Sequence, residues 1–116
     1  PVKVFILNNR YLGMVRQWQE FFHGGRYSES YTDSLPDFVK LAESYGIKGI
    51  RATKPKELNK VIEEMINHDG PVIADICVDQ KENVFPMIPS GAAHNQMKFK
   101  DDDKIATSTK DGKMLV

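Results

Sequence analysis

The sequence predicts an α/β fold: a partial parallel sheet of about three strands flanked by helices, followed by an irregular C-terminal tail. Two observations support this prediction. Short apolar runs, typical of strands covered on both faces, alternate with segments whose apolar residues recur at helical spacing. Beyond about position 97 this pattern gives way to charged and polar residues. We therefore expect one domain over 1–97 and a polar tail over 98–116.

Three apolar runs predict the strands. Residues 2–7 are almost all β-branched or large and apolar, which favours a strand buried on both faces. Residues 47–52 predict a short second strand, and residues 72–78 predict the last one. The last run contains the one cysteine of the chain, Cys77, which we expect to be a buried structural thiol.

Three segments predict helices. Residues 13–22 carry apolar side chains at helical spacing. Residues 36–45 have proline in the first turn and glycine directly after the end, where these residues are favoured. A third helix opens at Pro55 and presents one apolar stripe. The stripe consists of Leu58, Val61, Ile62, Met65 and Ile66. Residues 23–33 indicate a loop, and residues 86–91, with two prolines, exclude a helix or a central strand.

Composition excludes several classes of function. Lys plus Arg and Asp plus Glu both number 16, so no excess charge attracts nucleic acid or an anionic membrane, and we expect neither partner. The longest apolar runs are too short to span a bilayer, and no signal peptide is indicated. A single cysteine excludes an internal disulfide and fits a reducing compartment. We expect a cytoplasmic location in a bacterium, or an organellar one in a eukaryote.

The pair Asn8-Asn9 follows the first predicted strand directly, at the edge where open parallel sheets bind ligands. An asparagine carbonyl is a hard, neutral oxygen ligand that suits Mg²⁺ beside a carboxylate and phosphate oxygens. Asparagines after a strand are also common turn formers. The residues alone leave both interpretations open.

Other candidate residues also have a structural interpretation. Met14 and Trp18 on the first predicted helix could be core residues, because such side chains fill gaps and bury large areas. Ser90-Gly91 could be a plain turn after a proline. Arg16 and Arg26 could attract carboxylates or be simply solvated. The three histidines lack metal-ligand spacing, and no Ser-His-Asp or Cys-His arrangement is indicated.

Four segments together indicate a family. They are Leu7-Asn8-Asn9, Leu12-Gly13-Met14-Val15 with Gln17-Trp18, Arg26-Tyr27-Ser28, and Pro86-Met87-Ile88-Pro89-Ser90-Gly91. In order and spacing they resemble the acetolactate synthase family of thiamine-diphosphate enzymes. The asparagine pair is shared by many such enzymes, whereas the Gly-Met-Val-x-Gln-Trp and Pro-Met-Ile-Pro-Ser-Gly motifs are more specific. The resemblance runs from residue 1 to about residue 97.

The resemblance implies part of an enzyme that joins pyruvate, with loss of carbon dioxide, to a second pyruvate or to 2-ketobutyrate in branched-chain amino-acid biosynthesis. It implies thiamine diphosphate and Mg²⁺ as cofactors, and FAD bound mostly outside this chain. The implied partners are the rest of the catalytic subunit, a second copy in a homodimer or tetramer, and a small regulatory subunit.

The resemblance also implies site residues. The family's metal motif begins with Gly-Asp-Gly or Gly-Asp-Ala and ends with the asparagine pair. Carried over, Asn9 binds Mg²⁺ through its side chain and Tyr11 through its backbone carbonyl, while Gly13 and Met14 lie at the cofactor. Because the chain opens inside a strand-like run, without the motif's aspartate or the family's activating glutamate, we expect a fragment. It should contain no catalytic residue and be inactive by itself.

A second set of implied residues contacts substrate and inhibitors. It comprises Met14, Val15 and Trp18 on the first predicted helix, with Ser90 and Gly91 in the proline-rich segment. In the family the tryptophan lines the substrate entry and favours the larger ketoacid, 2-ketobutyrate.

Two alternatives stay open. A related carboligase or decarboxylase, such as glyoxylate carboligase or pyruvate oxidase, would share the asparagine pair, but Gln17-Trp18 and Pro89-Ser90-Gly91 argue against it. The chain could also be a stand-alone α/β module that binds a partner or ligand and catalyses nothing. A partial sheet exposes strand edges and tends to self-associate, so a stable monomer in light scattering would favour such a module.

Overall fold

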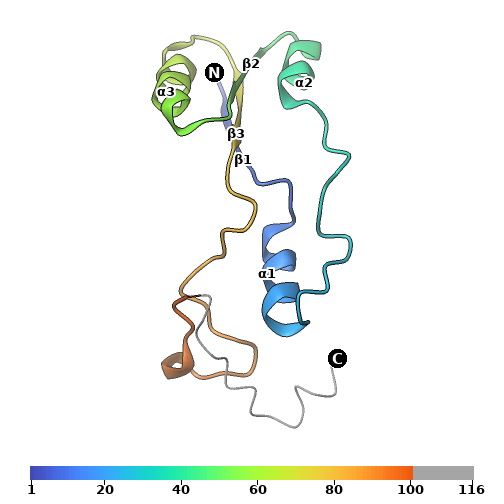
Figure 1. Cartoon of the computed structure of the whole chain (residues 1–116). Coiled ribbons are helices and arrows are strands. Elements are labelled where there is room, and N and C mark those ends of the chain that lie inside the picture. The colour runs from blue at the N-terminus through green and yellow to red at the C-terminus, as the bar shows by residue number, and fades with distance from the viewer. Residues whose placement is uncertain (101–116) are drawn as a thin grey trace. The chain divides into compact units, whose positions relative to one another are not determined.

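The computed structural model describes residues 1–100 and shows two compact units. The first consists of residues 1–12 and 31–81, and the described part of the second consists of residues 13–30 and 82–100. The first unit contains a parallel sheet with helices, which confirms the predicted α/β class (Figure 1).

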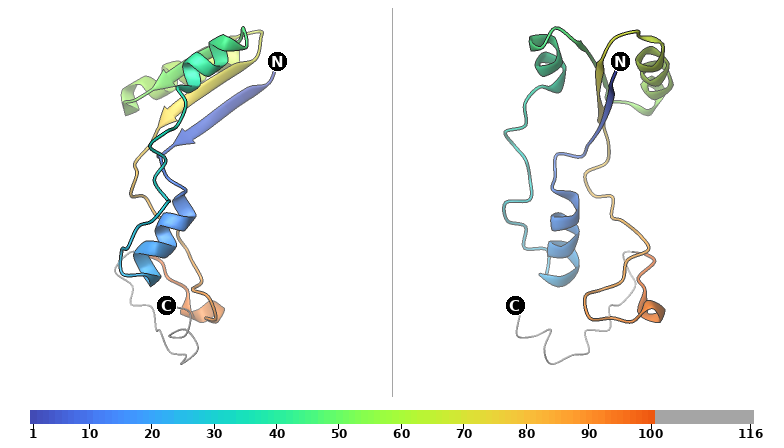
Figure 2. Two further views of the ribbon diagram at one scale, coloured as in Figure 1. Left: turned by 90° about the vertical axis from the view of Figure 1, so that its right-hand side faces the viewer. Right: turned by 180° about the vertical axis from the view of Figure 1, so that it is seen from behind.

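The sheet of the first unit has three parallel strands, as predicted. They are β1 (Lys3–Asn8), β2 (Lys48–Ala52) and β3 (Val72–Cys77), in the order β1-β3-β2. The last strand in the chain is thus the central one, and β1 lies along an edge (Figure 2). Because the strands are parallel, their carboxyl ends meet at one edge of the sheet.

Helices α2 (Phe38–Ser44) and α3 (Leu58–Asn67) lie on opposite faces of this sheet (Figures 1 and 2). Helix α2 begins two residues after Pro36, where the sequence predicted its start. The reason is that the Asp37 carboxylate caps the helix, accepting hydrogen bonds from the Val39 and Lys40 N–H groups. It is followed, as predicted, by Gly46 at a left-handed φ of 68°. The predicted third helix opens with a 3₁₀ turn, Pro55–Glu57, and continues as α3. Among the described residues, no helix combines the length and the apolar character that crossing a membrane requires.

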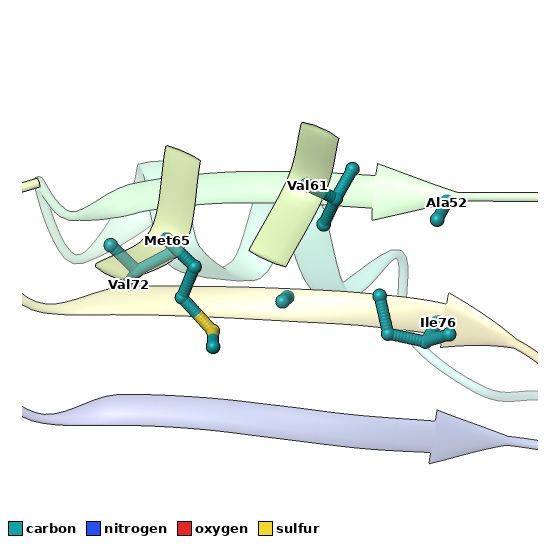
Figure 3. Packing of buried hydrophobic residues seen from close by; sticks show 6 residues of the cluster. Ala52, Val61, Met65, Val72 and Ile76 are labelled. Atoms are coloured by element: carbon teal, nitrogen blue, oxygen red, sulfur yellow. The ribbon is translucent and has the colours of Figure 1, made fainter. Parts of the chain in front are cut away.

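The core of the first unit lies between α3 and the sheet. Its buried members are Ala52, Val61, Met65, Val72, Ala74 and Ile76. Figure 3 shows Val61 and Met65 of α3 over the side chains of β2 and β3. The predicted stripe therefore faces the sheet at these two positions, and Leu58 packs partly buried against the same core, whereas Ile66 at the far end of the stripe is 65% exposed.

Two burial predictions are wrong. Strand β1 was expected to be covered on both faces, yet Phe5 is 38% and Leu7 66% exposed. The reason is its edge position, because α2 and α3 pack on β2 and β3. Cys77 is exposed rather than buried because it is the last residue of β3, at the carboxyl ends of the strands. Partial burial and the nearby Asp75 charge nevertheless raise the pKa of the thiol, which keeps it protonated at neutral pH.

The described part of the second unit contains α1 (Gly13–Phe22), which has the predicted bounds, the residues that follow it up to Ser30, and residues 82–100. Within the described residues 82–100 there is no strand ladder, and Met87 and Lys98 make an isolated antiparallel bridge. Lys98, the first residue of the predicted tail, is buried, with its Nζ 4.8 Å from the centre of the Phe21 ring. The rest of that tail, from 101 to 116, lies outside the described residues, and the division at residue 97 stays a prediction.

Candidate functional site

A tight polar turn follows β1 at the carboxyl edge of the sheet. The Asn8 side-chain oxygen accepts a hydrogen bond from the Arg10 N–H (3.1 Å), and the Asn9 side-chain oxygen accepts one from the Tyr11 N–H (3.0 Å). Both asparagines therefore act as turn formers, one of the two interpretations of their sequence. Between them and Tyr11, Arg10 has a φ of 59°, a left-handed conformation that residues other than glycine rarely adopt.

Contacts from a distant segment hold this turn in place. The Thr32 N–H donates to the Arg10 carbonyl at 2.9 Å, and Tyr11 and Tyr31 form an isolated antiparallel bridge. The two tyrosine rings meet edge to face, with centroids 5.0 Å apart, and the Arg10 guanidinium lies 5.5 Å from the Tyr31 ring centre. The conformation of the turn is thus stabilised by packing as well as by its own side chains.

A buried acid beside the turn escaped the sequence analysis. Asp75 in the central strand is 2% exposed, and its carboxylate accepts hydrogen bonds from the Asn8 amide (2.9 Å) and the Arg51 guanidinium (2.8 Å). Arg51 also pairs with Asp37 at 2.7 Å, and this hydrogen bond lowers the pKa of the Asp37 carboxyl group. The sequence did contain a sign of this contact, since Asp75 is the one acid within the apolar run of the last strand. A charge buried in such a strand needs a partner.

The turn offers oxygen ligands of the kind that Mg²⁺ prefers. An amide oxygen has two lone pairs, so the Asn9 oxygen that accepts from Tyr11 can also bind a cation. These ligands are neutral, and the residues that the structure describes contain no group of three or more His, Cys, Asp and Glu side chains able to hold a metal. The turn therefore fits a Mg²⁺ ion that receives its anionic ligands from elsewhere, such as phosphate oxygens.

The second unit contains an open groove of about 650 Å³ on one side of α1. Its lining residues are Met14, Val15, Trp18, Gln19, His23 and Arg26. Met14 is 49%, Val15 46% and Trp18 38% exposed, so none of them is a core residue in the described structure. Their apolar side chains together form a wall that could contact a small ligand.

The two candidate arginines differ in their surroundings. Arg16 is 5% exposed, pairs with Glu20 at 3.0 Å and lies 5.4 Å from the centre of the Tyr27 ring. Arg26 is exposed, lines the groove, and donates through its Nε to the His23 carbonyl at 3.1 Å. Of the two, Arg26 is the cation that borders the groove.

Gln17, which the sequence marked only as part of the Gly-Met-Val-x-Gln-Trp motif, joins α1 to the segment around Val84. It is 1% exposed, its side-chain oxygen accepts from the Val84 N–H (2.7 Å), and its amide donates to the Val84 carbonyl (3.1 Å) and the Met87 sulfur (3.0 Å). One side chain thus satisfies both backbone groups of Val84 and attaches the segment ahead of the proline-rich motif to α1.

Ser90 and Gly91 are exposed and form a turn. The Ala92 N–H donates to the Pro89 carbonyl at 3.0 Å, and Gly91 has a φ of 76°, the arrangement of a type II turn. The plain-turn interpretation thus describes their local structure. In the part of the chain that the structure describes, neither residue is among those that line the groove.

The task of Gln17 leads to a stability prediction. Gln17→Met keeps the size of the side chain but removes the two hydrogen bonds to the Val84 backbone, at a cost of about 1–3 kcal/mol. We expect faster hydrogen exchange at Val84 and a lower unfolding temperature. The control is Gln19→Met, which removes one side-chain hydrogen bond, to Ser28, on a less buried side chain. Equal effects of the two changes would contradict this role.

Comparison with known proteins adds evidence of relationship. Residues 1–76 match the family described as "Thiamine pyrophosphate enzyme, C-terminal TPP binding domain". The chain is 48% identical over 97 residues to the acetolactate synthase large subunit of Cyanidium caldarium, and 47% over 98 residues to that of Haemophilus influenzae. It is 41% identical over 97 residues to the large subunit of isozyme 2 from Escherichia coli. These alignments cover 83–84% of this chain and 17–18% of the relatives, so the chain spans about a sixth of their length.

Proposed function

The chain belongs to the thiamine pyrophosphate enzyme family, through its C-terminal TPP binding domain, and on this premise we propose that it is part of an acetolactate synthase large subunit. The observation that carries the proposal is its identity of 41–48% to three such subunits over more than four fifths of its length. The geometry supports it, because a turn with oxygen ligands is followed along the chain by a helix that lines an apolar groove.

We propose that the turn after β1 serves the cofactor. Thiamine diphosphate, when bound, supplies the electron sink that the loss of carbon dioxide from a 2-keto acid requires. The Asn9 side chain and the Tyr11 carbonyl would bind the Mg²⁺ that neutralises the diphosphate. Gly13, which has no side chain, would leave room for the cofactor beside the start of α1, and Met14 would contact it.

We propose that the α1 groove receives the 2-keto acids. These substrates have a carboxylate and a short alkyl chain, and the groove has a cation, Arg26, and an apolar wall of Met14, Val15 and Trp18. Desolvation by this wall favours longer alkyl chains by a modest amount. The turn at Ser90 and Gly91 would supply a further contact to substrates or inhibitors.

The remaining proposals concern what lies beyond this chain. The metal-binding aspartate, the activating glutamate and most of the FAD site would come from the rest of the large subunit. We propose a homodimer or tetramer with a small regulatory subunit, located in the cytoplasm or, in a eukaryote, in an organelle. The chain itself would bind and orient, and it would contribute no acid, base or nucleophile to the reaction.

The full gene product that contains this chain provides the test. We expect it to form acetolactate from pyruvate only when both thiamine diphosphate and Mg²⁺ are present. The 116-residue chain alone should show no saturable binding of either at micromolar concentration in calorimetry, because its proposed ligands are neutral. Tight binding by the chain alone would contradict the division of the metal site. Consumption of glyoxylate instead of pyruvate would favour the related carboligase.

A further inference from the structure

Asp75 is a buried acid with two defined partners. Its Oδ1 accepts a hydrogen bond from the Asn8 Nδ2 (2.9 Å) and its Oδ2 one from the Arg51 Nε (2.8 Å). The Arg51 side chain is 36% exposed, and an ion pair that reaches the solvent is weak evidence for stability. The acid in the middle of an otherwise apolar strand therefore points to a task in orientation.

The carboxylate determines which way the Asn8 amide faces. A carboxylate only accepts hydrogen bonds, so the Asn8 NH₂ group must point toward Asp75. The Asn8 oxygen then points the other way, where it accepts the Arg10 N–H at 3.1 Å. A reversed amide would place two acceptors together at Asp75 and two donors together at Arg10.

Arg10 is the residue on which the turn depends. Its left-handed backbone, with a φ of 59°, separates Asn9 from Tyr11. This strained conformation persists only where surrounding contacts support it. The Thr32 N–H supports its carbonyl at 2.9 Å, and the Asn8 oxygen supports its N–H. The second of these contacts is the one that Asp75 controls.

We propose that Asp75 is a positioning residue, which orients the Asn8 amide and thereby holds the turn that presents Asn9 and Tyr11. This inference rests on the proposed function for its consequence, which is the affinity for Mg²⁺ and thiamine diphosphate. The other part of the inference, that Asp75 keeps residues 8–11 in an ordered turn, is measurable by hydrogen exchange without any cofactor.

The test uses Asp75→Asn in the full gene product. Asn8 and Arg51 donate to different oxygens of the carboxylate, and in the amide one of these two positions becomes an NH₂ group, so one of the two donors loses its acceptor. We expect faster backbone hydrogen exchange over residues 8–11 without cofactor. We also expect the Mg²⁺ concentration at half-maximal binding of thiamine diphosphate to rise about 10–100-fold, as for other groups that orient metal ligands.

A matched control is Asp37→Asn. Asp37 pairs with the same guanidinium, at 2.7 Å, and it caps α2 through the Val39 and Lys40 N–H groups. It has no hydrogen bond to Asn8 among the contacts of the described residues. We expect residues 8–11 and the Mg²⁺ requirement to stay as in the unsubstituted protein.

The decisive variant exchanges the two side chains, Asn8→Asp together with Asp75→Asn. The carboxylate at position 8 then accepts from the amide at position 75 and from the Arg10 N–H, and the amide oxygen at position 75 accepts from Arg51. All three hydrogen bonds are kept, so slow exchange and Mg²⁺ affinity should largely return. Each single change should remain defective.

The outcomes separate the two proposals. Unchanged exchange over residues 8–11 in Asp75→Asn, or a double variant no better than the single ones, overturns the positioning role of Asp75. If Asp75 controls the exchange but the unsubstituted protein binds no thiamine diphosphate with Mg²⁺, the proposed function fails and the positioning role stands.

Discussion

Asn9→Ala in the full gene product should lower the affinity for Mg²⁺, and the rate at sub-saturating Mg²⁺, by at least the 10–100-fold typical of losses around a metal site. The change removes the proposed ligand oxygen. It also removes the acceptor of the Tyr11 N–H, whose 3.0 Å hydrogen bond closes the second half of the turn. A titration of activity and of thiamine diphosphate binding against Mg²⁺ measures the effect, and a large excess of Mg²⁺ should restore part of the activity.

Asn9→Asp separates the two contributions. A carboxylate at this position keeps an oxygen for the Tyr11 N–H and another for the cation, so the turn and the metal requirement should both survive. We expect Asn9→Asp to be closer to the unsubstituted protein than to Asn9→Ala. A normal Mg²⁺ requirement in Asn9→Ala would remove Asn9 from the metal site and leave it as a turn former only.

The sequence predicted the elements of this fold because each has a local signature. Helix α1 has the predicted bounds, Gly13–Phe22, since its apolar residues recur at helical spacing and a glycine-containing loop follows. The three strands were recognisable as apolar runs. The start of α2 differed by two residues, because the Asp37 cap, and not the proline before it, determines where that helix begins.

What the sequence could not show are the relations between distant positions. Asp75 meets Asn8 across 67 residues, and Gln17 meets Val84 across the same separation. No local pattern reports such a pairing, although an acid within an apolar strand is a hint of it. The exposure of Leu7 was mispredicted for a similar reason: an apolar run reports that a strand can be covered, while its place in the sheet decides whether it is.

The candidate site shows the same division. The turn after β1 was one of the two interpretations of the asparagine pair, and Met14 and Trp18, which the resemblance implied as contact residues, line the α1 groove. Their roles in binding stay predictions. The contacts that this turn receives from Thr32 at the Arg10 carbonyl, from Tyr31 at Tyr11 and from Asp75 at Asn8 come from other segments. Candidate ligand-binding residues thus stand out in a motif, whereas the contacts that position them depend on the fold.

Trp18→Leu in the full gene product should reduce the preference for 2-ketobutyrate over pyruvate by about 10-fold, while synthesis from pyruvate alone continues. The indole lines the groove and is 38% exposed, so it is available to the alkyl chain of a bound ketoacid. One extra methylene against an apolar surface changes selectivity by about 1–3 kcal/mol, which gives a preference and not exclusion. The measurement is the ratio of the two products when both ketoacids compete.

A product ratio is the right quantity because it is insensitive to a general loss of active protein. The control is Phe22→Leu. It removes the ring whose centroid lies 5.0 Å from that of the indole, and Phe22 does not line the groove. If Trp18 acts by contact, Trp18→Leu should shift the ratio much further than Phe22→Leu. If it acts only by packing α1, both changes should lower the yield and leave the ratio alone. An unchanged ratio in Trp18→Leu would therefore contradict a contact between the indole and the alkyl chain of the ketoacid.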